Sequence, residues 1–175
     1  MRSGYAPKGE IVHVLAALMP QNRLACEISL ATGLRINDVL ALKTEQVKKQ
    51  RFTVREEKTG KTRLVRLPRD LLDRALSYAG QHFVFEGRIN GRRHRTRQAV
   101  YKDLRRVADF FRLKDHISPH SLRKIYAVGE YRKHGDLQRV KKLLNHSDEA
   151  VTVLYAMADL LNKRKRKVDK TDRTC

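Results

Sequence analysis

The stretch Ser118–Ala156, SPHSLRKIYAVGEYRKHGDLQRVKKLLNHSDEAVTVLYA, carries four side chains around which the rest of the chain can be organised. His120 and Arg123 are three residues apart, so a helix would present both on one side. His146 follows, and Tyr155 comes nine residues after it. Histidine transfers protons near neutral pH, arginine binds anions with a planar fork, and tyrosine can attack as a nucleophile. We interpret the four as a site that acts on a phosphodiester.

The charge balance predicts a polyanionic partner. The 175 residues include 39 lysines and arginines against 19 aspartates and glutamates, a formal net charge of +20. So large an excess favours nucleic acid as the partner, ahead of a membrane surface. The hydrophobic fraction of 41% is enough for a folded core.

The cysteines and the N-terminus indicate the compartment. Cys26 lies in an apolar helical pattern and Cys175 is the last residue, so neither a disulfide framework nor a cysteine metal site is expected. The N-terminus lacks the apolar segment of a signal peptide, and no apolar run has membrane-spanning length. We therefore expect a soluble, cytoplasmic protein with no membrane association.

Hydrophobic periodicity predicts a mostly helical chain with one small antiparallel sheet, an α+β fold in a single domain. The sheet is expected from strands at residues 47–57 and 63–67, joined by the turn 58–61. The expected helices span residues 10–19, 22–32, 35–42, 69–78 and 96–111, a segment that starts at Ser118-Pro119, residues 135–144, and a last segment capped by Ser147.

Three regions follow from this pattern. Residues 1–9 are expected to form a flexible leader, residues 10–161 the folded domain, and residues 162–175 a basic tail. Within the domain, the glycine-containing loop 87–97, GRINGRRHRTR, is too polar for a core and suits phosphate contact. The basic side chains that we expect to contact DNA are Lys61, Arg63, Arg92, Arg93, Arg95, Arg97 and Lys124.

The chemistry of a phosphodiester explains why these residue types matter. Its anionic oxygens repel a nucleophile and its alkoxide leaves poorly, so catalysis needs cations, a proton donor and a positioned nucleophile. Arginine makes two hydrogen bonds to such oxygens at once. A tyrosine that attacks phosphorus stores the bond energy in a phosphotyrosine, without water or ATP. The sequence has no acidic cluster suited to Mg²⁺, and we expect neither metal nor cofactor.

Each of the four side chains also has a purely structural interpretation. A His-x-x-Arg pair on a helix is a weak signal by itself. His146 follows two leucines and could be a capping or core histidine. Tyr155 stands among Val151, Val153 and Leu154, where a tyrosine often packs in the core with its hydroxyl at the edge.

Four blocks, taken in order, resemble the catalytic domain of the tyrosine recombinases, the phage integrase family. The similarity covers residues 10–160 and implies the fold of that domain. ATGLRINDVLAL (31–42) is similar to the block with the first catalytic arginine, and EEKTGKTRLVRL (56–67) to the hairpin with the catalytic lysine. SPHSLRKIYAV (118–128) is similar to the His-x-x-Arg block, and LLNHSDEAVTVLYA (143–156) to the block that ends in the nucleophile.

The resemblance implies a role for each matching residue, divided among anion binding, proton transfer and attack. Arg35 and Arg123 hold the non-bridging oxygens, Lys58 protonates the leaving 5′ oxygen, His120 helps to move the proton of the tyrosine, His146 hydrogen-bonds the phosphate, and Tyr155 attacks to form a 3′-phosphotyrosyl link.

Two assignments have alternatives. Asp38 would orient the catalytic side chains without contacting the phosphate itself, or it is an ordinary exposed helix carboxylate. Lys61 flanks the same glycine as Lys58 and is the competing candidate for the proton donor.

The resemblance implies site-specific recombination or integration of double-stranded DNA by a homo-oligomer, which in this family is a tetramer. It also implies an origin in a bacterium, phage or mobile element and an association with the nucleoid. Two other interpretations stay open: a DNA-binding accessory protein of the same fold that does not cut, and an enzyme similar to a topoisomerase or telomere resolvase.

The chain also departs from the pattern of the family. Asn145 stands where glycine is usual, and Lys124 where histidine is common. Family members usually carry an N-terminal DNA-binding domain before the catalytic domain, so we expect either a fragment or a minimal recombinase, with an accessory DNA-binding domain or protein as a possible partner.

Overall fold

The computed structural model describes residues 8–113 and 117–144 and confirms a mostly helical fold with one small antiparallel sheet. The chain divides into two compact units, residues 1–126 and 127–175. The elements are α1 (Lys8–Ala16), α2 (Pro20–Thr32), α3 (Ile36–Leu40), α4 (Thr44–Val47), β1 (Arg51–Arg55), β2 (Thr62–Arg66), α5 (Arg69–Tyr78), α6 (Arg97–Phe110), α7 (Pro119–His134) and α8 (Leu137–Leu143).

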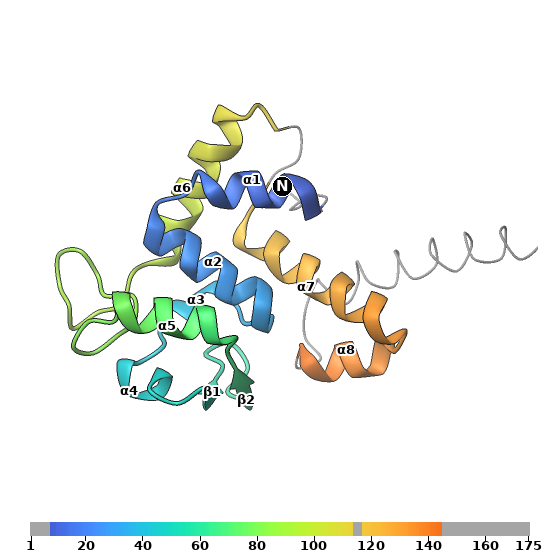
Figure 1. Ribbon diagram of the computed structural model, residues 1–175, viewed down its shortest axis with the longest axis horizontal. Coiled ribbons are helices and arrows are strands. Elements are labelled where there is room, and N and C mark those ends of the chain that lie inside the picture. The colour runs from blue at the N-terminus through green and yellow to red at the C-terminus, as the bar shows by residue number, and fades with distance from the viewer. Residues whose placement is uncertain (1–7, 114–116, 145–175) are drawn as a thin grey trace, which may run out of the picture. The chain divides into compact units, whose positions relative to one another are not determined.

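Helix α2 is at the centre of the first unit. It contacts α1, α3, α5 and α6, and Figure 1 shows it running between α1 and α5. Leu24, Ala25, Cys26 and Ile28 are fully buried along it. Burial raises the pKa of the Cys26 thiol, so this cysteine stays protonated and packs as a small apolar side chain, as expected.

Local sequence explains where α2 begins and where it ends. Pro20 occupies the first turn, where its fixed backbone angle suits a helix start, so α2 begins two residues before the predicted Asn22. The backbone N–H of Met19 donates to Asp103 on α6 at 2.9 Å. At the other end Gly33 adopts a left-handed conformation, with φ of 67°, and ends the helix as predicted.

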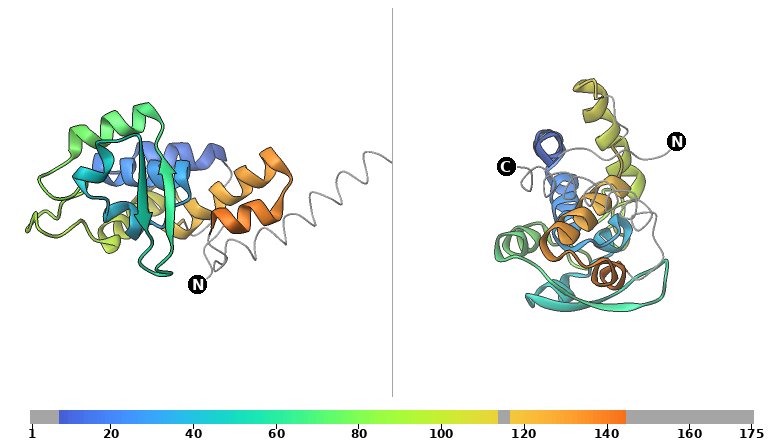
Figure 2. Two further views of the ribbon diagram at one scale, coloured as in Figure 1. Left: turned by 90° about the horizontal axis from the view of Figure 1, so that it is seen from below. Right: turned by 90° about the vertical axis from the view of Figure 1, so that its right-hand side faces the viewer.

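The two strands pair antiparallel, with Phe52 opposite Val65 and Val54 opposite Arg63 (Figure 2, left). Phe52, Val54 and Val65 are buried. The strand predicted from residue 47 begins only at Arg51, because residues 44–47 form α4 instead. That short helix is stabilised at its start by the Gln46 side chain, which accepts a hydrogen bond from the Lys43 backbone at 2.9 Å.

The helices that lead to the His-x-x-Arg block were predicted closely. Helix α5 spans the predicted residues Arg69–Tyr78. Thr96 caps α6, with its side chain accepting from the backbone N–H of Ala99. Pro119 is the first residue of α7, as predicted, and Leu122 lies in the core of the first unit.

In the second unit, α7 ends at His134 and Gly135 adopts φ of 66°. The Asp136 side chain accepts hydrogen bonds from the backbones of Gln138 and Arg139 and so caps α8. The predicted new helix after Gly135 is therefore confirmed. The predicted final helix lies outside the described residues. Lys8 and Gly9, which we expected in a flexible leader, belong to α1.

Within residues 8–113 and 117–144, no helix is both long enough and apolar enough to span a membrane.

Candidate active site

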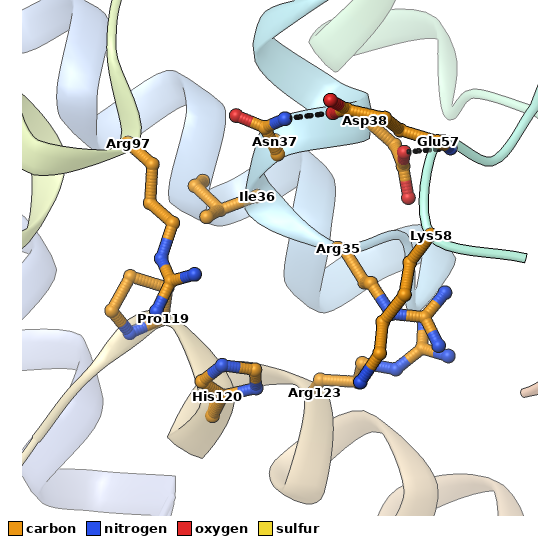
Figure 3. A pocket seen from close by; sticks show the side chains of 10 residues that line it. All are labelled: Arg35, Ile36, Asn37, Asp38, Glu57, Lys58, Arg97, Pro119, His120 and Arg123. Carbon is orange, nitrogen blue, oxygen red and sulfur yellow. Dashed lines mark hydrogen bonds between the residues drawn. The ribbon is translucent and has the colours of Figure 1, made fainter. Parts of the chain in front are cut away.

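A cavity of ≈ 560 Å³ in the first unit brings together four of the six predicted catalytic residues, Arg35, Lys58, His120 and Arg123 (Figure 3). They come from segments far apart in sequence: the start of α3, the hairpin turn, and the first turns of α7. The other lining residues are Ile36, Asn37, Asp38, Glu57, Arg97 and Pro119.

Arg35 reaches the cavity because of the way α2 ends. After Gly33 the chain turns, and Arg35 is the residue that precedes α3. Its guanidinium donates to the Glu56 carboxylate at 2.5 Å, and the Arg35 side chain is only 10% exposed. Glu56, the residue after β1, is fully buried. The ion pair therefore holds Arg35 in one orientation.

Arg123 is almost completely buried, with an exposure of 2%. Its guanidinium donates to the backbone carbonyl of Gly33. Arg63 donates to the neighbouring carbonyl, that of Thr32. The carbonyls at the C-terminus of a helix carry partial negative charge, so the end of α2 stabilises both cations.

Lys58 projects from the hairpin turn into the cavity. The turn is closed by two backbone hydrogen bonds, from Gly60 to Glu56 at 2.8 Å and from Glu56 to Lys61 at 2.9 Å. Gly60 takes a φ of 65°, which favours glycine. Lys61, the competing candidate, is exposed and is not among the residues that line the cavity.

Asp38 links α3 to this turn. Its carboxylate accepts a hydrogen bond from the backbone N–H of Glu57 at 2.9 Å, and only 4% of the residue is exposed. Burial raises the pKa of Asp38, while the bond from Glu57 and the charges of Arg35 and Arg123 oppose that rise. Asp38 is therefore buried beside the site, and not the exposed carboxylate of the alternative interpretation.

The opposite side of the cavity comes from α6 and α7. His120 is half-buried there, one helical turn before Arg123. Arg97, the first residue of α6, extends into the cavity from the side opposite Arg35 and Lys58 (Figure 3). We predicted that Arg97 contacts DNA, but no motif indicated that it would share a cavity with the catalytic candidates.

The remaining predicted DNA contacts differ in their exposure and in their partners. Arg92 and Arg93 are exposed on the loop before α6. Arg63 and Arg95 are directed at other parts of the chain: Arg95 donates to Asn22 at 2.6 Å and to Gln21 at 3.2 Å. Lys124 is 6% exposed. Contact of any of these seven residues with DNA stays a prediction.

Glu56 is the residue of this site that sequence reasoning missed. A signal was available, because side chains alternate between the faces of a strand. Phe52 and Val54 point inward, so Glu56 continues the buried face. A carboxylate on a buried face requires cationic or hydrogen-bonding partners.

His146 and Tyr155 lie outside the described residues, so their positions relative to the cavity stay predictions. Among the described residues, no group of three or more histidine, cysteine, aspartate or glutamate side chains is arranged to hold a metal ion. What the described part of the cavity offers is a concentration of cations, suited to an anion such as phosphate.

Comparison with known proteins gives a consistent result. The model of a family described as the phage integrase family matches residues 8–160. The putative integrase/recombinase y4qK of Sinorhizobium fredii is 31% identical over 153 residues, which cover 83% of this chain and 49% of that protein. Tyrosine recombinase XerD of Ralstonia nicotianae is 32% identical over 151 residues, 80% of this chain and 49% of that protein. The chain thus spans about half the length of these relatives.

Solved structures share the fold. A lambda integrase dimer bound to a COC′ core site superposes with a TM-score of 0.72 at 20% identity, over 87% of this chain and 47% of that one. XerA recombinase gives a TM-score of 0.70 at 19% identity, over 98% and 64%. The lambda integrase catalytic core gives 0.69 at 21% identity, over 85% of this chain and 95% of that one.

Proposed function

The chain belongs to the phage integrase family, and on that premise we propose that it is a site-specific recombinase that cleaves and rejoins DNA strands through Tyr155. The observation that carries the proposal is the shared cavity of Arg35, Lys58, His120 and Arg123. An accessory protein that only binds DNA has no need of a lysine and a histidine converging with two arginines on one site.

The proposed reaction is a transesterification at phosphorus. The hydroxyl oxygen of Tyr155 attacks, a tyrosine–phosphorus bond forms, and the bond to the 5′ oxygen breaks. The proton of the tyrosine leaves with the help of His120, and Lys58 gives a proton to the departing 5′ oxygen. Arg35, Arg123 and His146 stabilise the charge on the non-bridging oxygens. Rejoining reverses these steps with a 5′ hydroxyl as the attacking group.

The buried arginines are suited to this role. Arg35 and Arg123 are held by Glu56 and by the Gly33 carbonyl, so they need little reorganisation when charge develops on the phosphate. A phosphodiester bond is exchanged for another phosphodiester bond, so the reaction requires neither water nor ATP. We propose that it requires neither metal nor cofactor.

Double-stranded DNA is the proposed substrate. Exposed cations on the hairpin turn (Lys61), on the loop before α6 (Arg92 and Arg93) and at the cavity itself (Arg97) would bind its backbone phosphates. We further propose that a homo-tetramer assembles on DNA and that a separate DNA-binding domain or protein contributes to site recognition. Residues 10–161 would form the catalytic domain and residues 162–175 a basic tail. The proposed setting is the cytoplasm, in association with the nucleoid, and the proposed origin is a bacterium, a phage or a mobile element.

The test is capture of a covalent adduct. The protein is incubated with nicked suicide duplexes taken from the DNA that flanks its gene, and the products are separated on a denaturing gel. We expect a protein–DNA adduct that Tyr155→Phe abolishes without weakening DNA binding. If the wild-type protein binds these duplexes and forms no adduct, the proposal is wrong and the DNA-binding accessory protein becomes the better interpretation. Relaxation of supercoiled DNA, without strand exchange between two sites, would favour the topoisomerase interpretation.

A further inference from the structure

We propose that Glu56 is a positioning residue that holds Arg35 and the turn carrying Lys58 in one fixed geometry. The inference rests on the proposed recombinase function, since it assigns Arg35 and Lys58 to the reaction. Glu56 lies just after β1 and is 0% exposed.

The contacts of the Glu56 carboxylate are specific. One oxygen accepts from Arg35 at 2.5 Å and from the Thr59 hydroxyl at 3.1 Å. The other oxygen lies 3.7 Å from the guanidinium of Arg63, which is itself bound to the Thr32 carbonyl. A buried charge is tolerated only with such partners, so each partner is constrained by the carboxylate.

The backbone of Glu56 closes the turn that carries Lys58. Its N–H donates to Lys61 and its carbonyl accepts from Gly60. Thr59, which is bound to the carboxylate, is the residue next to Lys58. Glu56 therefore contacts Arg35 through its side chain and shapes the Lys58 turn through its backbone.

A second link supports the same geometry. Asp38, on α3, accepts from the backbone N–H of Glu57. Together with the Arg35–Glu56 pair, this bond joins the start of α3 to the hairpin turn at two adjacent points. Two points of attachment fix an orientation that one contact leaves free to rotate, so Arg35 and Lys58 face the phosphate in a fixed relation.

The Glu56 carboxylate is expected to favour cleavage through this geometry but to lower the affinity for DNA. A negative charge 2.5 Å from Arg35 weakens the attraction of that guanidinium for phosphate. Removing the charge should therefore leave affinity for uncut DNA unchanged or increased, while cleavage slows because Arg35 and Lys58 lose their fixed relation. A residue that only stabilises the fold would not separate affinity from rate in this way.

The experiment compares Glu56→Gln with the wild-type protein in single-turnover adduct formation at saturating DNA. The glutamine keeps the size of the side chain and removes its charge. We expect the rate constant to fall tenfold or more, because a displacement of about 1 Å in a catalytic group can cost about 100-fold in rate. The dissociation constant for uncut DNA should be no weaker than that of the wild type.

The matched control is Asp103→Asn, which neutralises another buried carboxylate. Asp103 binds Asn22 at 2.7 Å and Arg106 at 2.8 Å and does not line the cavity. Its loss should lower thermal stability and leave the rate constant unchanged at temperatures where the protein is folded. Rates are therefore measured below the melting temperature of each variant, and Glu56→Asp replaces Glu56→Gln if the glutamine variant does not fold.

The outcomes separate the two proposals. Absence of an adduct with the wild-type protein contradicts the recombinase function itself. A wild-type adduct together with a Glu56→Gln rate constant within tenfold of the wild type overturns the positioning role. A slow variant whose DNA affinity falls in parallel, or a control that slows equally, also overturns it, because Glu56 would then act through the fold alone.

Discussion

Arg123 donates a hydrogen bond to the carbonyl oxygen of Gly33, the residue that ends α2. The two residues are 90 positions apart in sequence. Through this bond a helix end sets the position of a buried guanidinium in the cavity. The same turn of the chain leads directly to Arg35, so one backbone feature positions both arginines of the proposed phosphate clamp.

Replacing Gly33 with alanine should therefore destabilise the protein. The φ of 67° is unfavourable for alanine, and a Cβ at this position would overlap the ring of Tyr126. The strained backbone costs about 1–2 kcal/mol and the overlap about 1–3 kcal/mol more. Urea unfolding of Gly33→Ala should show a loss of more than about 2 kcal/mol in the free energy of unfolding.

Gly60→Ala is the matched control for this prediction. Its φ of 65° is similar, but apart from Gly60 itself and its two neighbours in the chain no heavy atom lies within 4 Å of the position of the new Cβ. Its cost should be limited to the backbone strain of about 1–2 kcal/mol. Equal losses for the two variants would show that the contact between Gly33 and Tyr126 is unimportant.

Asp103→Asn should destabilise the protein at neutral pH and lose its effect in acid. Burial alone raises the pKa of Asp103, but hydrogen bonds from Asn22, Arg106 and the Met19 backbone bring that pKa below the ordinary value. A pKa lower in the folded state than the unfolded value of about 3.9 stabilises the fold above that value, and the contribution disappears as the pH falls through the folded pKa.

The measurement is urea unfolding of both proteins between pH 7 and pH 2. At pH 7 the variant should be less stable by about 1–3 kcal/mol, the usual cost of disturbing a buried hydrogen-bonded carboxylate. The gap should narrow below about pH 4. A gap that stays constant with pH would mean that the charge of Asp103 contributes nothing to stability.

Removing the charges of Arg92 and Arg93 should weaken binding to duplex DNA mainly at low salt. Both side chains are exposed on the loop before α6. Each phosphate contact that is lost should reduce the slope of log affinity against log salt by about 0.9, so the double alanine variant should lose about 1.8.

The control is Arg51→Ala with Arg55→Ala, which removes the same charge from the exposed face of β1. Titrations of fluorescent duplex DNA across a salt series should give the wild-type slope for this variant. An equal fall in both variants would indicate that binding depends on net charge alone and not on the loop.

Local signals in the sequence predicted most of the elements. Pro68 and the amphipathic pattern after it define α5, and Thr96 caps α6 as expected. Gly33 was identified as a helix stop because glycine readily adopts the left-handed conformation. An exception is α4, where the Gln46 side chain caps the helix start by accepting from the backbone N–H of Lys43. This cap outweighs the tendency of Val47 to form a strand.

The site was predicted only in part, for a physical reason. Motifs identified Arg35, Lys58, His120 and Arg123, which line one cavity. The partners that orient them are set by tertiary contacts that no local pattern contains, such as the bond from Arg35 to Glu56, 21 residues away. The positions of His146 and Tyr155 lie outside the described residues and stay predictions.

Lys58, and not Lys61, should be the proton donor to the leaving oxygen. Both lysines belong to the same turn, but only Lys58 lines the cavity with Arg35 and Arg123. Lys58→Ala should slow adduct formation by about 100-fold or more, within the usual range for loss of a general acid. Lys61→Ala, which removes an equal charge three residues away, should keep a rate constant near that of the wild type.

A DNA substrate with sulfur in place of the leaving 5′ oxygen distinguishes proton donation from phosphate binding. A thiol has a pKa of about 8.5 and leaves as a thiolate, so it needs no proton from the enzyme. The Lys58→Ala variant should therefore recover most of its rate on this substrate, whereas Arg123→Ala, which removes a proposed phosphate ligand, should stay slow. If Lys58→Ala stays slow on this substrate, the assignment is wrong, because the Lys58 charge is then needed for something other than protonating the leaving group. The assignment is also wrong if Lys61→Ala is the variant that is slow on the ordinary substrate and recovers on the sulfur substrate.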